Sequence, residues 1–513
     1  MIKRTLVREN FYSDSVALMR ISNKVSTLPD VEDVLVGMAT ELNRELVESL
    51  GATTDEVRAA SPNDLIVTVV AQNQEALERA FEEVEAQLTR KHVESSDVEE
   101  AHYDSIREVA GLEAGYNMAV VSVPGAYAAR ECRIALENDI NVFLFSDNVT
   151  VDEEIALKDL ARERGLLMMG PDCGTALING VPLGFANVVR KGPIGIVAAS
   201  GTGLQHVTCL IDALGSGISQ GVGVGGRDLS SAVGGRTMLA TLDAIGADPE
   251  TEVVIILSKP PAPEVAEKVL EKAKGLGKPV VLCLFGREIQ ADLSGVTLCS
   301  DMEATALAAV TLATGTEPTL KDRWYSEEPV EAFQAARGAE QQFVRGIFCG
   351  GTVCDEAMVT FRSQGLSIHS NIPLSPGEGL ADVHVSEGNT FIDMGDDFFT
   401  RGKPHPMIEP SLRNQRIISD ALLPDTAVML LDVELGYGSH PDPVGVLLEA
   451  VAEAKQRLGE RQVLWIASIV GTEGDPQGLE NQIGRLRENG FVVSVSNVRA
   501  ARLAAKLAKG GAQ

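Results

Sequence analysis

Two turns rich in glycine carry the residue types that bind small anions. The first, "AASGTG", follows the apolar run 194–197 and precedes a helical pattern, and it contains Ser200, Gly201, Thr202 and Gly203. Small residues let the backbone approach an oxyanion, and the unpaired amides at a helix start favour negative charge. The alternative is a tight turn that a hydroxyl merely caps. Because the turn lacks the Walker lysine and the GxGxxG pattern, it does not indicate ATP or NAD.

The second turn, "GVGVGGRD" (221–228), also ends a predicted strand. Gly225 and Gly226 permit close backbone approach, and the guanidinium of Arg227 can form a bidentate contact with the same anion. The alternative is an ion pair with Asp228 or a solvated side chain. Two such turns at consecutive strand ends favour a shared phosphate site, because ligands gather at the carboxyl ends of parallel strands.

The loop "GKPHPMIEPSLRNQR" (402–416) contains side chains suited to a small carboxylate substrate. Lys403 and Arg413 can clamp a carboxylate. His405 can act as a general acid or base, since the ordinary histidine pKa is about 6.5. The alternative is that His405 hydrogen-bonds a backbone carbonyl and only fixes the loop.

A further helix start is predicted in "GYGSHPDP" (436–443). Gly438 and Ser439 can approach an anion there, and His440 can donate a hydrogen bond to it. The alternative is that His440 simply precedes a helix that begins at Pro443.

Two other turns offer carboxylates and a thiol for substrate binding. In "FIDMGDDFF" (391–399), Asp393, Asp396 and Asp397 can bind magnesium or orient an amine; the alternative is that one of them caps a helix and another pairs with a lysine. In "GPDCGT", Asp172 precedes Cys173, whose turn can lower the thiol pKa. The alternative for Cys173 is a small buried filler.

The strands that deliver these turns are visible as apolar runs. From residue 117 the runs show no alternation, most end in Gly, Ser, Asp or Pro, and helical patterns separate most of them, which predicts parallel sheets covered on both faces. Residues before about 92 follow a strand–helix order typical of a ferredoxin-like domain. We predict an α/β protein whose segments are a ferredoxin-like α+β domain at 1–95, a Rossmann-like half domain at 96–187, a three-layer domain at 188–318, a linker at 319–340 and a flavodoxin-type domain at 341–513.

Composition limits the class of protein. The 73 acidic and 44 basic residues give a net charge of −29, which disfavours nucleic acid and anionic membranes as partners. No apolar run reaches about 18 residues, and the first residues lack a signal-peptide core. The seven scattered cysteines are typical of a reducing cytoplasm. The pair in "CGGTVC" has no second pair or nearby histidine, so no metal site is predicted.

The order of these motifs resembles succinyl-CoA synthetase. "GPDCGTALING", "GPIGIVAASGTG", "GVGVGGRD" and "KPVVLCLFG" are similar to its α subunit, residues 117–174 resemble part of its CoA-binding domain, and residues 343–507 resemble the carboxyl-terminal domain of its β subunit. The set "FSDNV", "GPDCGT", "ASGTG", "GGRDLS", "SKPPA", "IDMGDDF" and "GSHPDPVG" resembles the FdrA family. The resemblance implies a CoA-binding-like half domain, an α-like ligase domain and a β-tail-like domain.

The synthetase resemblance also implies a mechanism. In that family two helix N-termini point at one phosphate site, where a phosphohistidine passes phosphate to an acyl group. Carried over, the two helices here begin near Ser200–Gly203 and near Gly438–Pro443. Together they would form an acyl-phosphate site within one chain.

Four departures from the synthetase pattern alter the implied chemistry. The loop 287–301, which would carry the phosphorylated histidine, contains none. Lys259 stands where the family has the glutamate that steadies that histidine. The glycine-rich turn that opens the family's CoA-binding domain is missing. An ATP-grasp domain is missing as well.

The FdrA resemblance therefore implies a transferase subunit that uses a preformed acyl phosphate. The expected reaction is carbamoyl transfer between carbamoyl phosphate and oxamate, with oxalurate and phosphate as the other pair, in purine or allantoin catabolism. Lys259, His405 and His440 are the predicted catalytic residues. Expected partners are the acyl phosphate, a carboxylate substrate, other subunits and a second copy of the chain.

Two alternatives remain open. The first is an ADP-forming acyl-CoA synthetase completed by a partner chain, and only this alternative implies CoA or ATP as cofactors. The second is a non-catalytic scaffold subunit that binds phosphate.

Overall fold

The computed structural model describes residues 2–9, 11, 15–26, 28–61, 64–90, 103, 105–110, 112, 115–286, 293–401 and 403–508. The chain divides into two compact units. The first comprises residues 1–103 with 402–404, and the second comprises residues 104–401 with 405–513.

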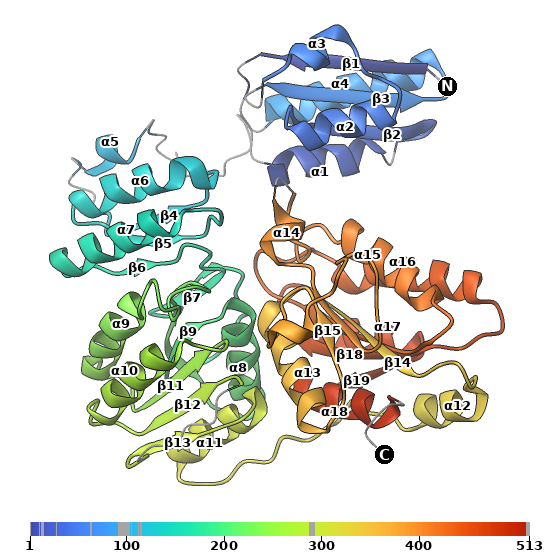
Figure 1. Ribbon diagram of the computed structural model, residues 1–513. Coiled ribbons are helices and arrows are strands. Elements are labelled where there is room, and N and C mark those ends of the chain that lie inside the picture. The colour runs from blue at the N-terminus through green and yellow to red at the C-terminus, as the bar shows by residue number, and fades with distance from the viewer. Residues whose placement is uncertain are drawn as a thin grey trace. The chain divides into compact units, whose positions relative to one another are not determined.

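The first unit contains a three-stranded antiparallel sheet with the order β1-β3-β2 (Figure 1). Its central strand β3 is apolar at six of seven positions and buried throughout, because helix side chains pack on both of its faces and a strand flanks each edge. The elements are β1 (Ile2–Arg8), α1 (Ser15–Ser26), β2 (Val31–Met38), α2 (Glu41–Ser49), α3 (Asp55–Ala59), β3 (Leu65–Ala71) and α4 (Gln74–Arg90). This confirms the predicted small N-terminal α+β domain.

The second unit begins with a short parallel sheet of order β4-β5-β6. A capping box at Thr150 and Glu153 starts α7, and Gly165 in the left-handed region ends it. The elements are α5 (Ile106–Ala110), β4 (Met118–Val121), α6 (Gly125–Glu137), β5 (Asn141–Leu144), α7 (Val151–Arg164) and β6 (Met168–Met169).

A seven-stranded sheet follows, with the order β13-β12-β11-β9-β10-β7-β8. Its elements are β7 (Thr175–Ile178), β8 (Val181–Gly184), β9 (Lys191–Ala199), α8 (Gly201–Ala213), β10 (Ile218–Gly223), α9 (Arg236–Ala247), β11 (Val253–Ser258), α10 (Pro263–Lys274), β12 (Val280–Leu284), β13 (Val296–Leu298) and α11 (Met302–Thr314). Five strands are parallel, and the β7–β8 hairpin adds an antiparallel edge. The sheet therefore begins before the domain start predicted at residue 188.

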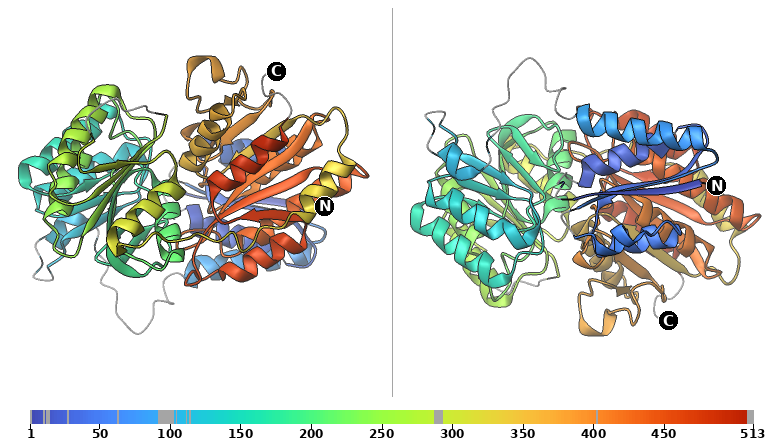
Figure 2. Two further views of the ribbon diagram at one scale, coloured as in Figure 1. Left: turned by 90° about the horizontal axis from the view of Figure 1, so that it is seen from below. Right: turned by 90° about the horizontal axis from the view of Figure 1, so that it is seen from above.

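The last sheet has six strands and is entirely parallel, with the order β15-β16-β14-β17-β18-β19, and helices cover both of its faces (Figure 2). Its elements are β14 (Phe343–Phe348), α13 (Gly351–Ser363), β15 (His369–Ser370), the 3₁₀ turn η1 (Pro376–Glu378), β16 (Thr390–Asp393), α14 (Asp397–Thr400), α15 (Ser411–Leu422), β17 (Thr426–Glu434), α16 (Pro443–Leu458), β18 (Leu464–Val470), α17 (Leu479–Glu488), β19 (Phe491–Ser494) and α18 (Asn497–Leu507). The buried apolar strands match the predicted parallel α/β architecture.

The segment 319–340 is not the simple linker that its polar composition predicts. It forms α12 (Glu328–Ala336), and Trp324, Val330 and Phe333 are buried in the large core. That core is shared by the seven-stranded and six-stranded sheets, and α8 and α13 lie against each other between them (Figure 1). In the part of the chain that the structure describes, no helix has the length and apolar character needed to cross a membrane.

Candidate functional site

The N-termini of α8 and α13 meet in the second unit. Each helix follows a buried parallel strand, β9 and β14 respectively, and Ser200 caps α8 by accepting a hydrogen bond from Gly203 N at 2.9 Å. The hydroxyls of Ser200 and Thr352 are 2.5 Å apart, so the two helix starts are in direct contact. Two partial positive charges therefore converge on one point.

Glycines make this approach feasible. A Cβ at Gly203 would touch the Ser200 hydroxyl and lie 2.9 Å from the Thr352 methyl group, and a Cβ at Gly350 would lie 2.5 Å from the methyl group of Thr202. A Cβ at Gly351 would touch Lys259 Nζ. These glycines thus let neighbouring side chains lie directly against the backbone of the first turn of α13.

Lys259 supplies a full positive charge at this place. It follows the last residue of β11 and, among the described residues, makes no hydrogen bond or ion pair through its ammonium group. Burial would lower the pKa of Lys259, but Asp355, Asp393 and Asp172 outweigh that effect and raise it. The ammonium is therefore charged at neutral pH.

Two of those carboxyl groups are buried beside Lys259. Asp355 lies on α13 and Asp393 ends β16. Desolvation raises the pKa of Asp355 to about 6 and that of Asp393 to about 7, and in both cases Lys259 opposes the shift. Near neutral pH both carboxyl groups are partly protonated. They therefore offset the positive charge of Lys259 less than two fully ionised carboxylates would.

The structure corrects the predicted partner of α8. The second helix at the site is α13, whereas the sequence predicts the helix that begins near Gly438–Pro443. That helix, α16, has Asp442 as its N-cap, and the Asp442 side chain accepts from Gly445 N at 3.0 Å and pairs with Arg485. Its N-terminus is already neutralised by the chain's own carboxylate.

The predicted residues around α16 are correspondingly occupied elsewhere. His440 Nδ1 accepts a hydrogen bond from Asp442 N at 3.0 Å, which matches the alternative that it precedes the helix. A Cβ at Gly438 would lie 2.8 Å from the Phe185 ring, and the Ser439 hydroxyl is buried without a partner among the described residues. None of these groups contacts Ser200 or Thr352.

His405 lies close to the carboxyl end of β16. Its Nδ1 accepts from Met407 N at 3.3 Å, and a Cβ at Gly395 would lie 2.6 Å from its Nε2. Burial lowers the pKa of His405 to about 4, although the Asp432 charge acts in the opposite direction. His405 is therefore a neutral imidazole at neutral pH, and this low pKa disfavours both predicted roles, general acid and general base.

Arg413 does not clamp a substrate. Its guanidinium is buried and donates to Ile347 O, Asp432 O and Asp432 Oδ1, the last two at 2.7 Å. Asp432 also accepts from the amides of Cys349 and Gly350, the two residues that precede α13. The pair Arg413–Asp432 holds the turn at which α13 begins.

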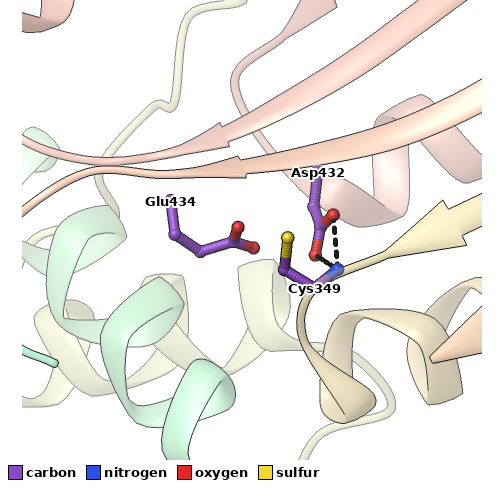
Figure 3. Close-up of side chains that lie close together, drawn as sticks. All are labelled: Cys349, Asp432 and Glu434. Carbon is purple, nitrogen blue, oxygen red and sulfur yellow. Dashed lines mark hydrogen bonds between the residues drawn. The ribbon is translucent and has the colours of Figure 1, made fainter. Parts of the chain in front are cut away.

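Glu434 lies beside that turn, with its carboxyl group facing the thiol of Cys349 (Figure 3). Cys349, Asp432 and Glu434 are the one set of described side chains close enough together to hold a metal ion. Desolvation and the charge of Asp432 raise the pKa of Glu434 well above its ordinary value. Because Arg413 already balances Asp432, a protonated Glu434 accounts for the charge of this cluster without a metal.

The turn at Gly225–Arg227 is built for close packing. Gly225 has a φ of +90°, and a Cβ there would touch Pro171 O. Arg227 donates to Val149 O at 2.7 Å and pairs with Glu154 at 3.1 Å. The predicted alternative, a pair with Asp228, is wrong because Asp228 is buried against Lys158 at 2.7 Å.

Asp172, Cys173, Asp396 and Asp397 were predicted to bind substrate, and their surroundings differ. Asp172 and Asp397 have exposed surface. Desolvation raises the pKa of Asp172 to about 7 against the charge of Lys259, and it also raises the pKa of Asp397. Cys173 is a buried filler: it donates to Gly223 O at 3.3 Å, and desolvation raises its pKa to about 12. Asp396 caps α14.

Lys403 belongs to the first unit, and the site lies in the second. The site residues that the sequence missed are Gly350, Gly351, Thr352 and Asp355, whereas Asp393 is one of the three carboxylates predicted in "FIDMGDDFF". The strand–Gly–Gly–helix pattern of "IFCGGTV" was the available signal, since it repeats the pattern of "IVAASGTG".

Comparison with known proteins defines the class of this chain. Residues 347–507 match the family model described as CoA-ligase, and residues 189–285 match the model described as CoA binding domain. The α subunit 2 of the ADP-forming succinate–CoA ligase of Archaeoglobus fulgidus is 29% identical over 35% of this chain and 62% of its own length. The fold is therefore that of the succinyl-CoA synthetase-like acyl-CoA ligases.

Over its whole length the chain has a nearer relative. YahF of Escherichia coli strain K12, described as an uncharacterized protein, is 42% identical over 98% of both chains. The chain belongs to the YahF family.

A solved structure is also similar. The dinucleotide-forming acetyl-coenzyme A synthetase 1 of Ca. Korarchaeum cryptofilum matches with a TM-score of 0.35 and 15% identity, covering 80% of this chain and 86% of that chain.

The N-terminal residues 1–104 match the family model described as AllF, heavy metal-associated domain. Heavy metals are held in proteins chiefly by cysteine thiolates. The segment contains no cysteine, because the first one in the chain is Cys132. The residues present therefore do not fit a thiolate-bound metal.

Proposed function

We propose that the second unit binds the phosphoryl group of an acyl phosphate between the N-termini of α8 and α13 and transfers the acyl group to an acceptor. The observation that carries this proposal is the contact between Ser200 and Thr352. The start of α13 also lies beside the ammonium of Lys259, which has no hydrogen-bond or ion-pair partner among the described residues. Helix termini and a lysine are the groups that stabilise a departing phosphate.

The acceptor that we propose first is the amide oxamate, with carbamoyl phosphate as the donor. Two features support a preformed acyl phosphate: the loop 287–301 contains no histidine that could carry phosphate, and a lysine stands at position 259. An ammonium there stabilises the dianionic leaving group directly instead of pairing with a phosphorylated imidazole.

The second candidate is an ADP-forming acyl-CoA ligase that works with a partner chain. It is favoured by the matches to the CoA-ligase and CoA-binding models and by the succinate–CoA ligase relatives. In this case the acceptor is the CoA thiol, and a partner supplies the nucleotide-binding domain.

Calorimetric titration with inorganic phosphate tests the shared part of both candidates. Phosphate is expected to bind the native chain, and Lys259→Gln is expected to weaken binding at least tenfold, because the site loses its full positive charge. Lys268→Gln is the matched control, since Lys268 is an exposed lysine of the following helix α10. Equal affinity in the native chain and Lys259→Gln would remove the lysine from the site.

Phosphorus NMR separates the two candidates. Carbamoyl transfer predicts phosphate release from carbamoyl phosphate that depends on oxamate and does not require CoA. Ligation predicts CoA-dependent release from an acyl phosphate and a phosphorylated protein after incubation with ATP. Each reaction is measured with the chain alone and with the products of its neighbouring genes.

A further inference from the structure

Asp393 and Lys259 approach the same point from opposite sides of Gly351. A Cβ at Gly351 would touch Lys259 Nζ and would lie 2.5 Å from Asp393 Oδ2. The two groups do not form an ion pair with each other, and no described residue donates a hydrogen bond to Oδ2. A carboxylate oxygen and an ammonium therefore flank the bare backbone at the start of α13.

The orientation of Asp393 is fixed by its surroundings. Its Oδ1 accepts from Gly395 N at 2.9 Å. Its backbone exchanges two hydrogen bonds with the Asn371 side chain, at 2.9 and 3.0 Å. These contacts use Oδ1 and the main chain, and they leave Oδ2 as the oxygen that faces Gly351 and Lys259.

We propose that Asp393 is the catalytic base that takes the proton of the acyl acceptor, an inference that rests on the proposed binding of an acyl phosphate at α8 and α13. The acceptor's heteroatom forms a bond to the carbonyl carbon, and the bond between that carbon and the phosphate oxygen breaks. The electron pair leaves with the phosphate beside Lys259, and the acceptor's proton passes to Oδ2. The acceptor class is a neutral N–H or S–H nucleophile.

The groups around Asp393 suit this role. Lys259 faces it across Gly351, Asp355 faces it from α13, Asp396 follows it in the chain, and His405 lies against Gly395. Desolvation raises the pKa of Asp393 to about 7, while Lys259 and the amide of Gly395 oppose that shift. A base with this pKa is half available at neutral pH and still strong enough to hold the proton it receives.

Calorimetric titration with sulfate tests the inference without turnover. Sulfate is a dianion that does not titrate near neutral pH, so any proton exchanged on binding comes from the protein. A dianion beside Asp393 raises its pKa further, and the native chain is expected to take up part of a proton at pH 7. Titrations in buffers of different ionisation enthalpy measure that uptake.

Asp393→Asn is expected to bind sulfate at least as tightly as the native chain and to lose most of the proton uptake. Asp243→Asn, at an exposed carboxylate of α9, is the matched control and should keep the uptake. If sulfate does not bind the native chain, the proposed function fails and this inference falls with it. If sulfate binds and the uptake survives in Asp393→Asn, the phosphate site stands and Asp393 is not the base.

Turnover gives a second measurement. In whichever reaction the native chain supports, Asp393→Asn is expected to lower kcat by about 10²–10⁴-fold while KM changes less than threefold. The native kcat should rise as pH passes through about 7, because Asp393 must lose its proton to act. A flat profile in Asp393→Asn and partial rescue in Asp393→Glu are expected, whereas an unchanged kcat in Asp393→Asn would overturn the proposal.

Discussion

The helices α13 and α16 both begin after a turn that contains glycine, but their N-termini are capped differently. Both follow a buried parallel strand of the six-stranded sheet and a turn containing glycine. The N-cap of α13 is Gly350, which has no side chain to accept a hydrogen bond. The N-cap of α16 is Asp442, which accepts from Gly445 N and pairs with Arg485.

This difference shows what turns a helix start into an anion site. A capping carboxylate supplies the negative charge that the helix N-terminus favours, so little is left for a ligand. At α13 the cap is absent, a second helix start touches the first through Thr352, and Lys259 adds a cation. Variants at the start of one helix or the other therefore test this contrast.

The largest effect is expected for Asp432→Ala, which removes the anchor of the turn before α13. Asp432 holds two backbone amides and neutralises the buried Arg413, so the variant leaves a buried unpaired guanidinium. Loss of one partner of a buried pair costs about 3–5 kcal/mol. Urea unfolding should show this loss for Asp432→Ala, and a change below about 1 kcal/mol would contradict the anchoring role.

Next in size is Gly351→Ala, which places a methyl group against Lys259 Nζ and Asp393 Oδ2. Sulfate affinity is expected to fall by more than tenfold, because the methyl group occupies the position where the anion reaches the α13 backbone. The matched control is Gly484→Ala in α17, where a Cβ has no neighbour within 4 Å. That control should raise stability by about 0.5–1 kcal/mol and leave sulfate binding unchanged.

Most of the fold could be predicted from sequence because its strands are strongly apolar. Runs such as "VVIILS" and "AVMLLDVE" are short, largely apolar and typical of buried strands, and the structure confirms them as β11 and β17. The hairpin β7–β8 was missed because its strands have four residues each. Segment 319–340 was misjudged because α12 buries few residues in a polar stretch.

The site was harder to predict, and the reason is three-dimensional. Ser200 is identified by its turn, but its partner Thr352 lies 152 residues further along the chain. The synthetase resemblance leads to the helix start near Gly438–Pro443, whereas the structure places the start of α13 against α8. Arg413 likewise carries a guanidinium of the kind that binds carboxylate substrates. Only its burial against Asp432 shows that it stabilises the fold instead.

The smallest effect is expected for Asp442→Ala, which removes the cap of α16. Loss of a capping carboxylate costs about 0.5–2 kcal/mol, and the partner Arg485 is exposed enough to be resolvated. Urea unfolding should show this modest loss, while sulfate affinity at α13 stays within twofold of the native value. If Asp442→Ala instead creates a second sulfate site, capping alone separates α16 from α13. If it weakens the existing site, α16 contributes to it and the contrast between the two helices is wrong.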